Sequence, residues 1–180
     1  MQVFAGHVER LAPADRDRIK ARVPLGTWSD IASAGPLAWL PFEVNLACTY
    51  AVAECLGPER TDEFFRTLLL STFKTSLLQG LVDAVMRKLG SDPGASLFWI
   101  ARGFALMFED CGVWRVIERK PKQASLQVLG VPFAATRDRI WVQSVASALG
   151  ALNETARLPG TSRIQELDPK LGRVVFRLTW

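Results

Sequence analysis

The apolar positions of this chain recur at two different spacings, one before and one after residue 112. In the first part they recur every three to four residues, which is the period of a helix packed on one face. Pro41 and Gly57 frame one such segment, and Pro58 opens the next, because proline suits the first turn of a helix and glycine its end. A break near Ser76 and one bent helix both fit the stretch that follows, and we favour the break. Gly112 ends the last predicted helix of this part, which begins near residue 93.

The segment before Pro41 has weak periodicity. We expect residues 1–11 to be irregular or a short strand, and residues 13–22 to form a short helix. The Gly/Pro-rich stretch at 26–36 is expected to connect elements and to hold at most one helical turn.

After residue 112 the apolar positions alternate, as they do in half-buried strands. The four alternating segments are VWRVIE (113–118), SLQVLGV (125–131), TSRIQEL (161–167) and GRVVFRLTW (172–180). A helical pattern that begins near Arg137 separates the second from the third. We therefore predict an α+β protein in which a helical half precedes β-β-α-β-β, with a first hairpin loop longer than two residues.

The first and last strands are the most apolar, and central strands bury more than edges. We therefore predict a four-stranded antiparallel sheet of order 2-1-4-3, packed on helices. The face of the last strand that meets the helices is expected to bear Val174, Phe176, Leu178 and Trp180.

Length favours one domain over residues 1–180, with an N-terminal extension (1–40), a helical half (41–112) and a β half (113–180). Hydrophobic residues make up 49% of the chain, which is ample for a core, and the net charge is +4. Basic residues are mostly scattered among acids, so we expect no nucleic-acid partner. The one local excess is RVIERKPK (115–122), which fits either a solvated hairpin tip or a phosphate-binding patch.

Charges and amides interrupt the apolar stretches well before they reach the length of a membrane span. The N-terminus lacks the basic and apolar regions of a signal peptide. We therefore expect a cytoplasmic protein without a membrane span.

The residues that carry most enzyme and metal chemistry are scarce. The chain has one histidine, His7, and three cysteines, Cys48, Cys55 and Cys111, without a C-x-x-C pair. These residues do not cluster in the sequence as zinc ligands or as a nucleophile–histidine pair would. We therefore predict no catalytic residues, no metal site and no cofactor, and interpret the cysteines as ordinary buried thiols.

Three stretches carry a resemblance to known proteins: LGPERTDEFFRTLLLSTFKTSLLQGLVDAVMRKL, ARGFALMFEDCGVWRVI and FRLTW. They resemble a paralogous family of uncharacterised myxobacterial proteins. The helical half followed by β-β-α-β-β resembles, more remotely, the superfamily of heme-nitric-oxide-binding, vinyl-reductase-type and TRAPP-type proteins, which implies a small-molecule-binding fold.

The resemblance transfers little chemistry. Heme-binding members use a proximal histidine and a Tyr-x-Ser-x-Arg motif, whereas this chain has His7 alone, outside the matching region, and lacks the motif. Heme ligation of that type is therefore not expected. TRAPP-type members can hold an acyl chain, and Cys48 or Cys55 would stand near such a channel, although neither aligns with a modified cysteine.

Three hypotheses of function remain open. The first is a non-enzymatic sensor- or adaptor-like domain that binds an apolar small molecule or a protein, with a pocket near Phe104, Phe108, Trp114 and Phe176. The second is a structural, partner-binding and possible homo-oligomeric module, with Trp28 and Trp39 as interface anchors. The third is an enzyme whose site the sequence does not reveal.

Overall fold

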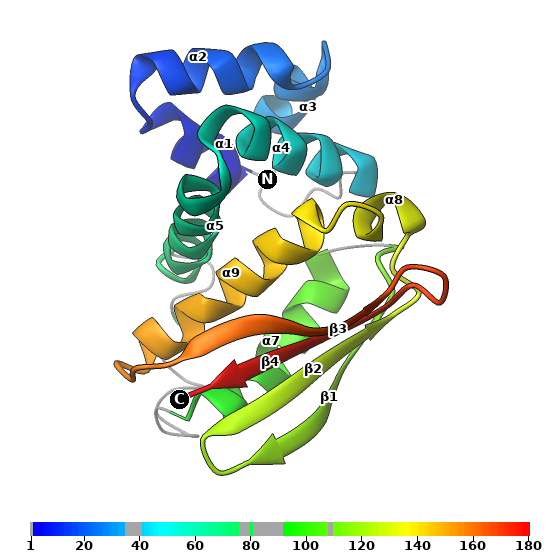
Figure 1. Ribbon diagram of the computed structural model, residues 1–180. Coiled ribbons are helices and arrows are strands. Elements are labelled where there is room, and N and C mark those ends of the chain that lie inside the picture. The colour runs from blue at the N-terminus through cyan, green and yellow to red at the C-terminus, as the bar shows by residue number, and fades with distance from the viewer. Residues whose placement is uncertain (1, 35–40, 76–79, 81–91, 108–109) are drawn as a thin grey trace.

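The computed structural model describes residues 2–34, 41–75, 80, 92–107 and 110–180. A four-stranded sheet forms one layer, α7 and α9 cover one of its faces, and helices α1–α5 gather beyond α9 (Figure 1). The helices are α1 (Gln2–Glu9), α2 (Pro13–Arg22), α3 (Thr27–Ser33), α4 (Phe42–Leu56), α5 (Pro58–Phe73), α7 (Pro93–Met107), α8 (Phe133–Thr136) and α9 (Ile140–Thr155). The strands are β1 (Val113–Lys120), β2 (Gln123–Leu129), β3 (Thr161–Asp168) and β4 (Arg173–Thr179). The predicted α+β class, a helical half followed by an antiparallel sheet, is confirmed.

The N-terminal segment is more helical than we expected. Residues 2–9 form α1 rather than an irregular segment or a strand, and residues 27–33 form α3. Both helices are short, so their stability comes from packing rather than from propensity. Phe4 and Val8 of α1 and Ile31 of α3 are buried in a core that they share with α4 and α5. Tertiary contacts therefore stabilise helices that sequence periodicity predicts poorly.

The helices from Pro41 onward begin and end close to the predicted residues. Gly57, at a φ of 75°, ends α4 and precedes Pro58 at the first turn of α5. The α5 helix ends at Phe73, which agrees with the break predicted near Ser76, although Ser76 itself lies outside the described residues. The helix predicted to follow that break lies largely outside the described residues.

The sheet has the order β1-β2-β4-β3, so the predicted order 2-1-4-3 is wrong. Strand β4 lies at the centre as expected, but its inner neighbour is β2, with Leu126 opposite Phe176. Strand β1 is an edge whose apolar Val113 and Ile117 are exposed. Overall apolar content was therefore misleading, because those two side chains do not face the core.

The facing of β4 agrees with the alternation. Val174, Phe176 and Leu178 are buried against the helices, whereas Arg173 and Arg177 lie on the opposite face. The first hairpin differs from our expectation, because Lys120 pairs with Gln123 and leaves a turn of only two residues.

An aromatic chain joins the helical layer to the sheet. The ring of Phe42 on α4 packs edge-on against Trp141 of α9, with centroids 5.3 Å apart, and Trp141 packs against Trp114 of β1 at 6.5 Å. The indole nitrogen of Trp141 donates a hydrogen bond to Asn45 Oδ1 at 2.9 Å. We name Phe42, Trp141 and Trp114 the aromatic ladder. These three rings pack between α4, α9 and β1.

Candidate functional site

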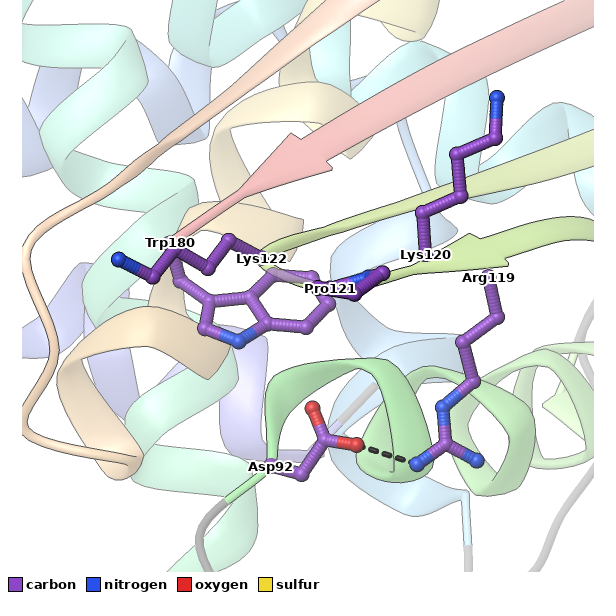
Figure 2. Close-up of a pocket in the computed structure, with 6 residues that line it drawn as sticks. All are labelled: Asp92, Arg119, Lys120, Pro121, Lys122 and Trp180. Atoms are coloured by element: carbon purple, nitrogen blue, oxygen red, sulfur yellow. Dashed lines mark hydrogen bonds and ion pairs between the residues drawn. The ribbon is translucent and has the colours of Figure 1, made fainter.

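A hollow of about 500 Å³ opens where the β1–β2 turn meets the start of α7. Figure 2 shows the six residues that line it: Asp92, Arg119, Lys120, Pro121, Lys122 and Trp180. The end of β1 and the turn supply the basic residues, and Trp180, directly after β4, supplies an indole ring. We refer to it as the turn hollow.

Backbone contacts fix the position of Trp180. Its amide donates a hydrogen bond to the Lys122 carbonyl at 3.0 Å, so the residue after β4 continues the pairing with the turn. Gly94 lies beneath the indole, and a Cβ at this position would stand only 2.8 Å from Trp180 Cη2. Any side chain at position 94 would therefore push the indole out of its present position.

The start of α7 is capped by an acid. Asp92 Oδ1 accepts a hydrogen bond from the Gly94 amide at 3.0 Å, which satisfies one of the free donors of a helix N-terminus. The other carboxylate oxygen of Asp92 is paired with Arg119. Asp92 is the acid of the turn hollow, and both of its oxygens are engaged.

Lys122 has an unusual backbone conformation. Pro121 precedes it, and its own φ is 61°, a combination typical of a type II turn. Glycine normally occupies this position, because a side chain with positive φ costs about 1–2 kcal/mol. The Lys122 ammonium has no ion pair or hydrogen bond within the ranges that the structure describes. The turn therefore retains a strained lysine whose charge is free.

The other lysine of the turn has a partner outside the hollow. Lys120 forms an ion pair with Glu118 at 2.5 Å, and this contact is the main reason why the pKa of Glu118 lies below its usual value. Both lysines extend outward from the turn in Figure 2. Their flexible four-carbon stems allow either ammonium group to fold over a ligand that contacts the indole.

This arrangement bears on the two interpretations of residues 115–122. Sequence reasoning found no aromatic residue among these charges, whereas the fold brings Trp180 beside Pro121. The signal was missed because the indole comes from the far end of the next hairpin. The indole and the basic residues line one hollow, which is the arrangement that the phosphate-binding interpretation requires.

The predicted ligand pocket stays a prediction. Trp114 and Phe176 lie in the core, with 7% and 1% of their surfaces exposed, and Trp114 belongs to the aromatic ladder. Phe104 lies on α7, and Phe108 falls outside the described residues. The turn hollow includes none of these four residues.

The predicted interface also stays a prediction. Trp28 is half-buried: it packs edge-on against Phe4 at 6.3 Å, and the Lys20 ammonium lies 5.4 Å from the centre of its ring. Trp39 lies outside the described residues. The structure instead exposes Phe98 and Trp99 on α7, which the sequence could have suggested, because both lie off the apolar stripe of that helix.

All three cysteines are free thiols; Cys48 and Cys111 are buried as expected, whereas Cys55 is only half-buried. Burial raises the pKa of both Cys48 and Cys111 to about 12, so each is protonated at neutral pH. Such thiols are poor nucleophiles and poor metal ligands. Within the described ranges no group of three or more His, Cys, Asp or Glu residues is arranged to hold a metal ion.

The single histidine lies away from the sheet. His7 of α1 packs edge-on against Phe64 of α5, with ring centroids 4.8 Å apart, and burial lowers its pKa. The described part of α7, the helix that precedes β1, carries no histidine, cysteine or tyrosine. The chain's one tyrosine, Tyr50 on α4, is followed by Ala-Val rather than by x-Ser-x-Arg. These residues do not fit a heme bound through the histidine and Tyr-x-Ser-x-Arg pattern.

Comparison with solved structures identifies the fold. An Fe(II) unliganded H-NOX protein from K. algicida covers 98% of this chain and 94% of its own, with 12% identity and a TM-score of 0.60. An oxygen-binding H-NOX domain related to soluble guanylate cyclases covers 98% and 90%, with 12% identity and a TM-score of 0.63. An H-NOX structure that addresses heme distortion covers 99% and 91%, with 10% identity and a TM-score of 0.64.

No protein-family model and no curated protein matches the chain. In the described part, no helix has the length and apolar character needed to cross a membrane. At identities of 10–14% the structural likeness establishes the fold alone. This chain therefore has the H-NOX fold over nearly its whole length.

Proposed function

We propose that this chain is a non-enzymatic, heme-independent binding domain that takes an anionic, ring-bearing small molecule in the turn hollow. The observation that carries the proposal is Lys122, a cation that has no partner among the described residues and lies in a strained backbone conformation beside Trp180. Strain of this kind tends to occur at functional sites, and here glycine would remove it. The sensor-like role is the one that the fold suggests. The ligand is anionic rather than the apolar molecule expected from the sequence, and its site is the turn hollow rather than the predicted pocket between helices and sheet.

Heme independence rests on the residues that the chain offers. The H-NOX proteins it resembles include Fe(II) and oxygen-bound forms. In this chain His7 packs on Phe64, and Cys48 and Cys111 are buried neutral thiols. The aromatic ladder adds side-chain bulk between the helices and the sheet.

The absence of enzymatic activity is supported by the same inventory. A general base within hydrogen-bond reach of a nucleophile is the usual requirement for covalent catalysis. His7 contacts an aromatic ring, and neither Cys48 nor Cys111 is ionised at neutral pH.

The class of ligand follows from the lining. The indole of Trp180 offers a flat apolar surface, and base–aromatic stacking contributes about 1–3 kcal/mol. Lys122 supplies a cation without a partner among the described residues, whereas Arg119 and Lys120 are already paired with Asp92 and Glu118. Guanidinium and ammonium groups bind phosphate and carboxylate oxygens, and the guanidinium can do so through two hydrogen bonds. A phosphorylated aromatic compound, such as a nucleoside monophosphate, satisfies both requirements.

Calorimetric titration with AMP, adenosine and ribose 5-phosphate separates the two contributions. We expect AMP to bind more tightly than either fragment, and its affinity to fall when salt screens the phosphate contacts. Lys122→Gln should weaken the binding of AMP at least about tenfold, since one charge-assisted contact contributes about 1.5–3 kcal/mol. Trp180→Leu should bring AMP down to the affinity of ribose 5-phosphate.

The matched control is Lys170→Gln, which removes the same charge from the exposed β3–β4 turn. An equal loss of affinity in this variant would show that only net charge attracts the ligand. No saturable binding of AMP to the unmodified chain would refute the proposal.

A further inference from the structure

A second hollow, of about 530 Å³, lies where α5 and α9 meet the start of β3. Its lining is mostly charged or polar, with small or apolar residues among them. The polar lining includes Glu59, Asp62, Glu63 and Arg66 of α5, Asn153 and Glu154 of α9, and Ser162 of β3. We refer to it as the acidic hollow.

The charges of the acidic hollow are not balanced. Its lining contains four carboxylates and one cation, Arg66. Arg66 is paired with both Glu63 and Glu154, and the Glu63 contact is the main reason why the Arg66 pKa is raised. Asp62 accepts hydrogen bonds only from neutral groups, Ser147 Oγ at 2.5 Å and Gln143 Nε2 at 3.4 Å. Glu59 and Asp62 have no cationic partner among the described side chains.

One residue that lines the hollow, Asn153, carries a buried acceptor without a donor. Asn153 is only 3% exposed, and its Nδ2 donates to the Thr179 carbonyl at 2.9 Å. This bond settles the orientation of the amide, so Oδ1 is the atom that has no partner. The hydroxyl of Ser162, which also lines the hollow, is buried and unpartnered as well.

The backbone holds this acceptor in place. A Cβ at Gly160 would stand 2.0 Å from the Thr179 carbonyl oxygen and 2.3 Å from Asn153 Nδ2. Only glycine therefore lets the α9–β3 connection pass so close to the Asn153 amide. The acceptor is rigidly placed, and buried acceptors in folded proteins normally receive a hydrogen bond.

These two features select a kind of ligand. Within the described part of the chain, these carboxylates do not form a group arranged to hold a metal ion. This disfavours a bare metal ion as the ligand. An organic cation with N–H groups can neutralise Glu59 and Asp62 and also donate to Asn153 Oδ1. The volume falls within the range of about 300–1,000 Å³ typical of small-molecule sites.

We propose that the acidic hollow binds a small organic polycation of the alkyl polyamine class. One ammonium group lies between Glu59 and Asp62, and a second N–H group donates to Asn153 Oδ1. Arg66 marks one boundary of the site, since it already neutralises Glu63 and Glu154. This site is separate in lining and opposite in charge to the turn hollow, and it does not depend on the function proposed there.

The test compares two dications that have the same six-carbon spacer. The probe 1,6-diaminohexane carries N–H donors, whereas hexamethonium carries equal charge and none. Calorimetry at low salt should show saturable binding of the diamine and at least about tenfold weaker binding of hexamethonium, the factor expected from one charge-assisted hydrogen bond. Equal affinities would overturn the assignment of Asn153 as acceptor.

Charge variants locate the site. Glu59→Gln with Asp62→Asn should weaken the diamine at least about tenfold, since both neutralising contacts are removed. Glu43→Gln with Glu54→Gln, on α4, removes equal charge outside the hollow and should leave the affinity within about twofold, as screening of distant charges predicts. Equal losses in the two pairs would overturn the proposal.

A spectroscopic readout avoids reliance on variants that unfold. In a ¹H–¹⁵N spectrum the diamine should shift the side-chain amide signals of Asn153, while hexamethonium should not. AMP should not displace the diamine, because its anionic group has no partner in the acidic hollow. An unmoved Asn153 signal at saturation would refute the proposed contact.

Discussion

Replacing Phe176 with alanine tests whether β4 holds the sheet on the helices. Phe176 is 1% exposed and lies between Leu126 of β2 and Ile164 of β3. Truncation removes roughly 100 Å² of buried apolar surface, which at about 25 cal/mol per Å² corresponds to about 2.5 kcal/mol. The cavity left behind raises the expected loss to about 3–5 kcal/mol. Domains of this kind are stable by about 5–15 kcal/mol, so this one ring contributes a large share.

Urea unfolding followed by circular dichroism measures the loss. With a slope of about 2 kcal/mol per molar urea, a loss of about 4 kcal/mol lowers the midpoint by about 2 M. The matched variant is Arg177→Ala, on the opposite face of the same strand. Arg177 lies directly opposite Arg163, so its removal also relieves a like-charge contact and should change stability by no more than about 0.5 kcal/mol. Equal damage by both variants would show that the facing of β4 is wrong.

Three further predictions concern the turn, the thiols and heme. Lys122→Gly should raise the free energy of unfolding by about 1 kcal/mol, since glycine is unstrained at positive φ, and a thermal melt that shows no gain would refute the strain argument. Because the pKa values of Cys48 and Cys111 are raised from 9.0 to about 12 in the folded chain, their contribution to stability is complete below pH 9.0 and is lost as the pH rises toward 12. The urea midpoint should therefore fall above pH 9.0, and a midpoint that is constant over this range would contradict the prediction. Titration with hemin should give no Soret band that depends on His7. A band that disappears in His7→Ala would show heme ligation and refute the prediction.

The elements of the β half could be predicted because strand alternation is a local property. The facing of Val174, Phe176 and Leu178 followed from the period of two alone. Strand order could not be read from apolar content, since that measure ignores which face an apolar side chain occupies. Charge would have served better: VWRVIERK carries four charged residues and QASLQVL none, as edge and central strands often do.

The two hollows were harder to predict than the fold. Each depends on residues that are distant in sequence, such as Lys122 and Trp180 in the turn hollow and Asp62 and Asn153 in the acidic hollow. Sequence reasoning noticed the basic run at 115–122 but had no means of placing an indole next to it. Helix α1 was missed for a related reason, because its burial against Phe64 and Phe65 is a tertiary effect.

The central place of β4 has a consequence for how the chain folds. Strand β2 pairs with β1 across a two-residue turn. Its other edge pairs only with β4, which is synthesised after α9 and β3. Until β4 arrives, an early β1–β2 hairpin presents an open edge and a row of apolar side chains, Ala124, Leu126 and Val128. Non-local pairing of this kind slows folding, and open edges of intermediates promote association between chains. Refolding yield should therefore fall as protein concentration rises, even though the finished sheet keeps this strand away from its edges.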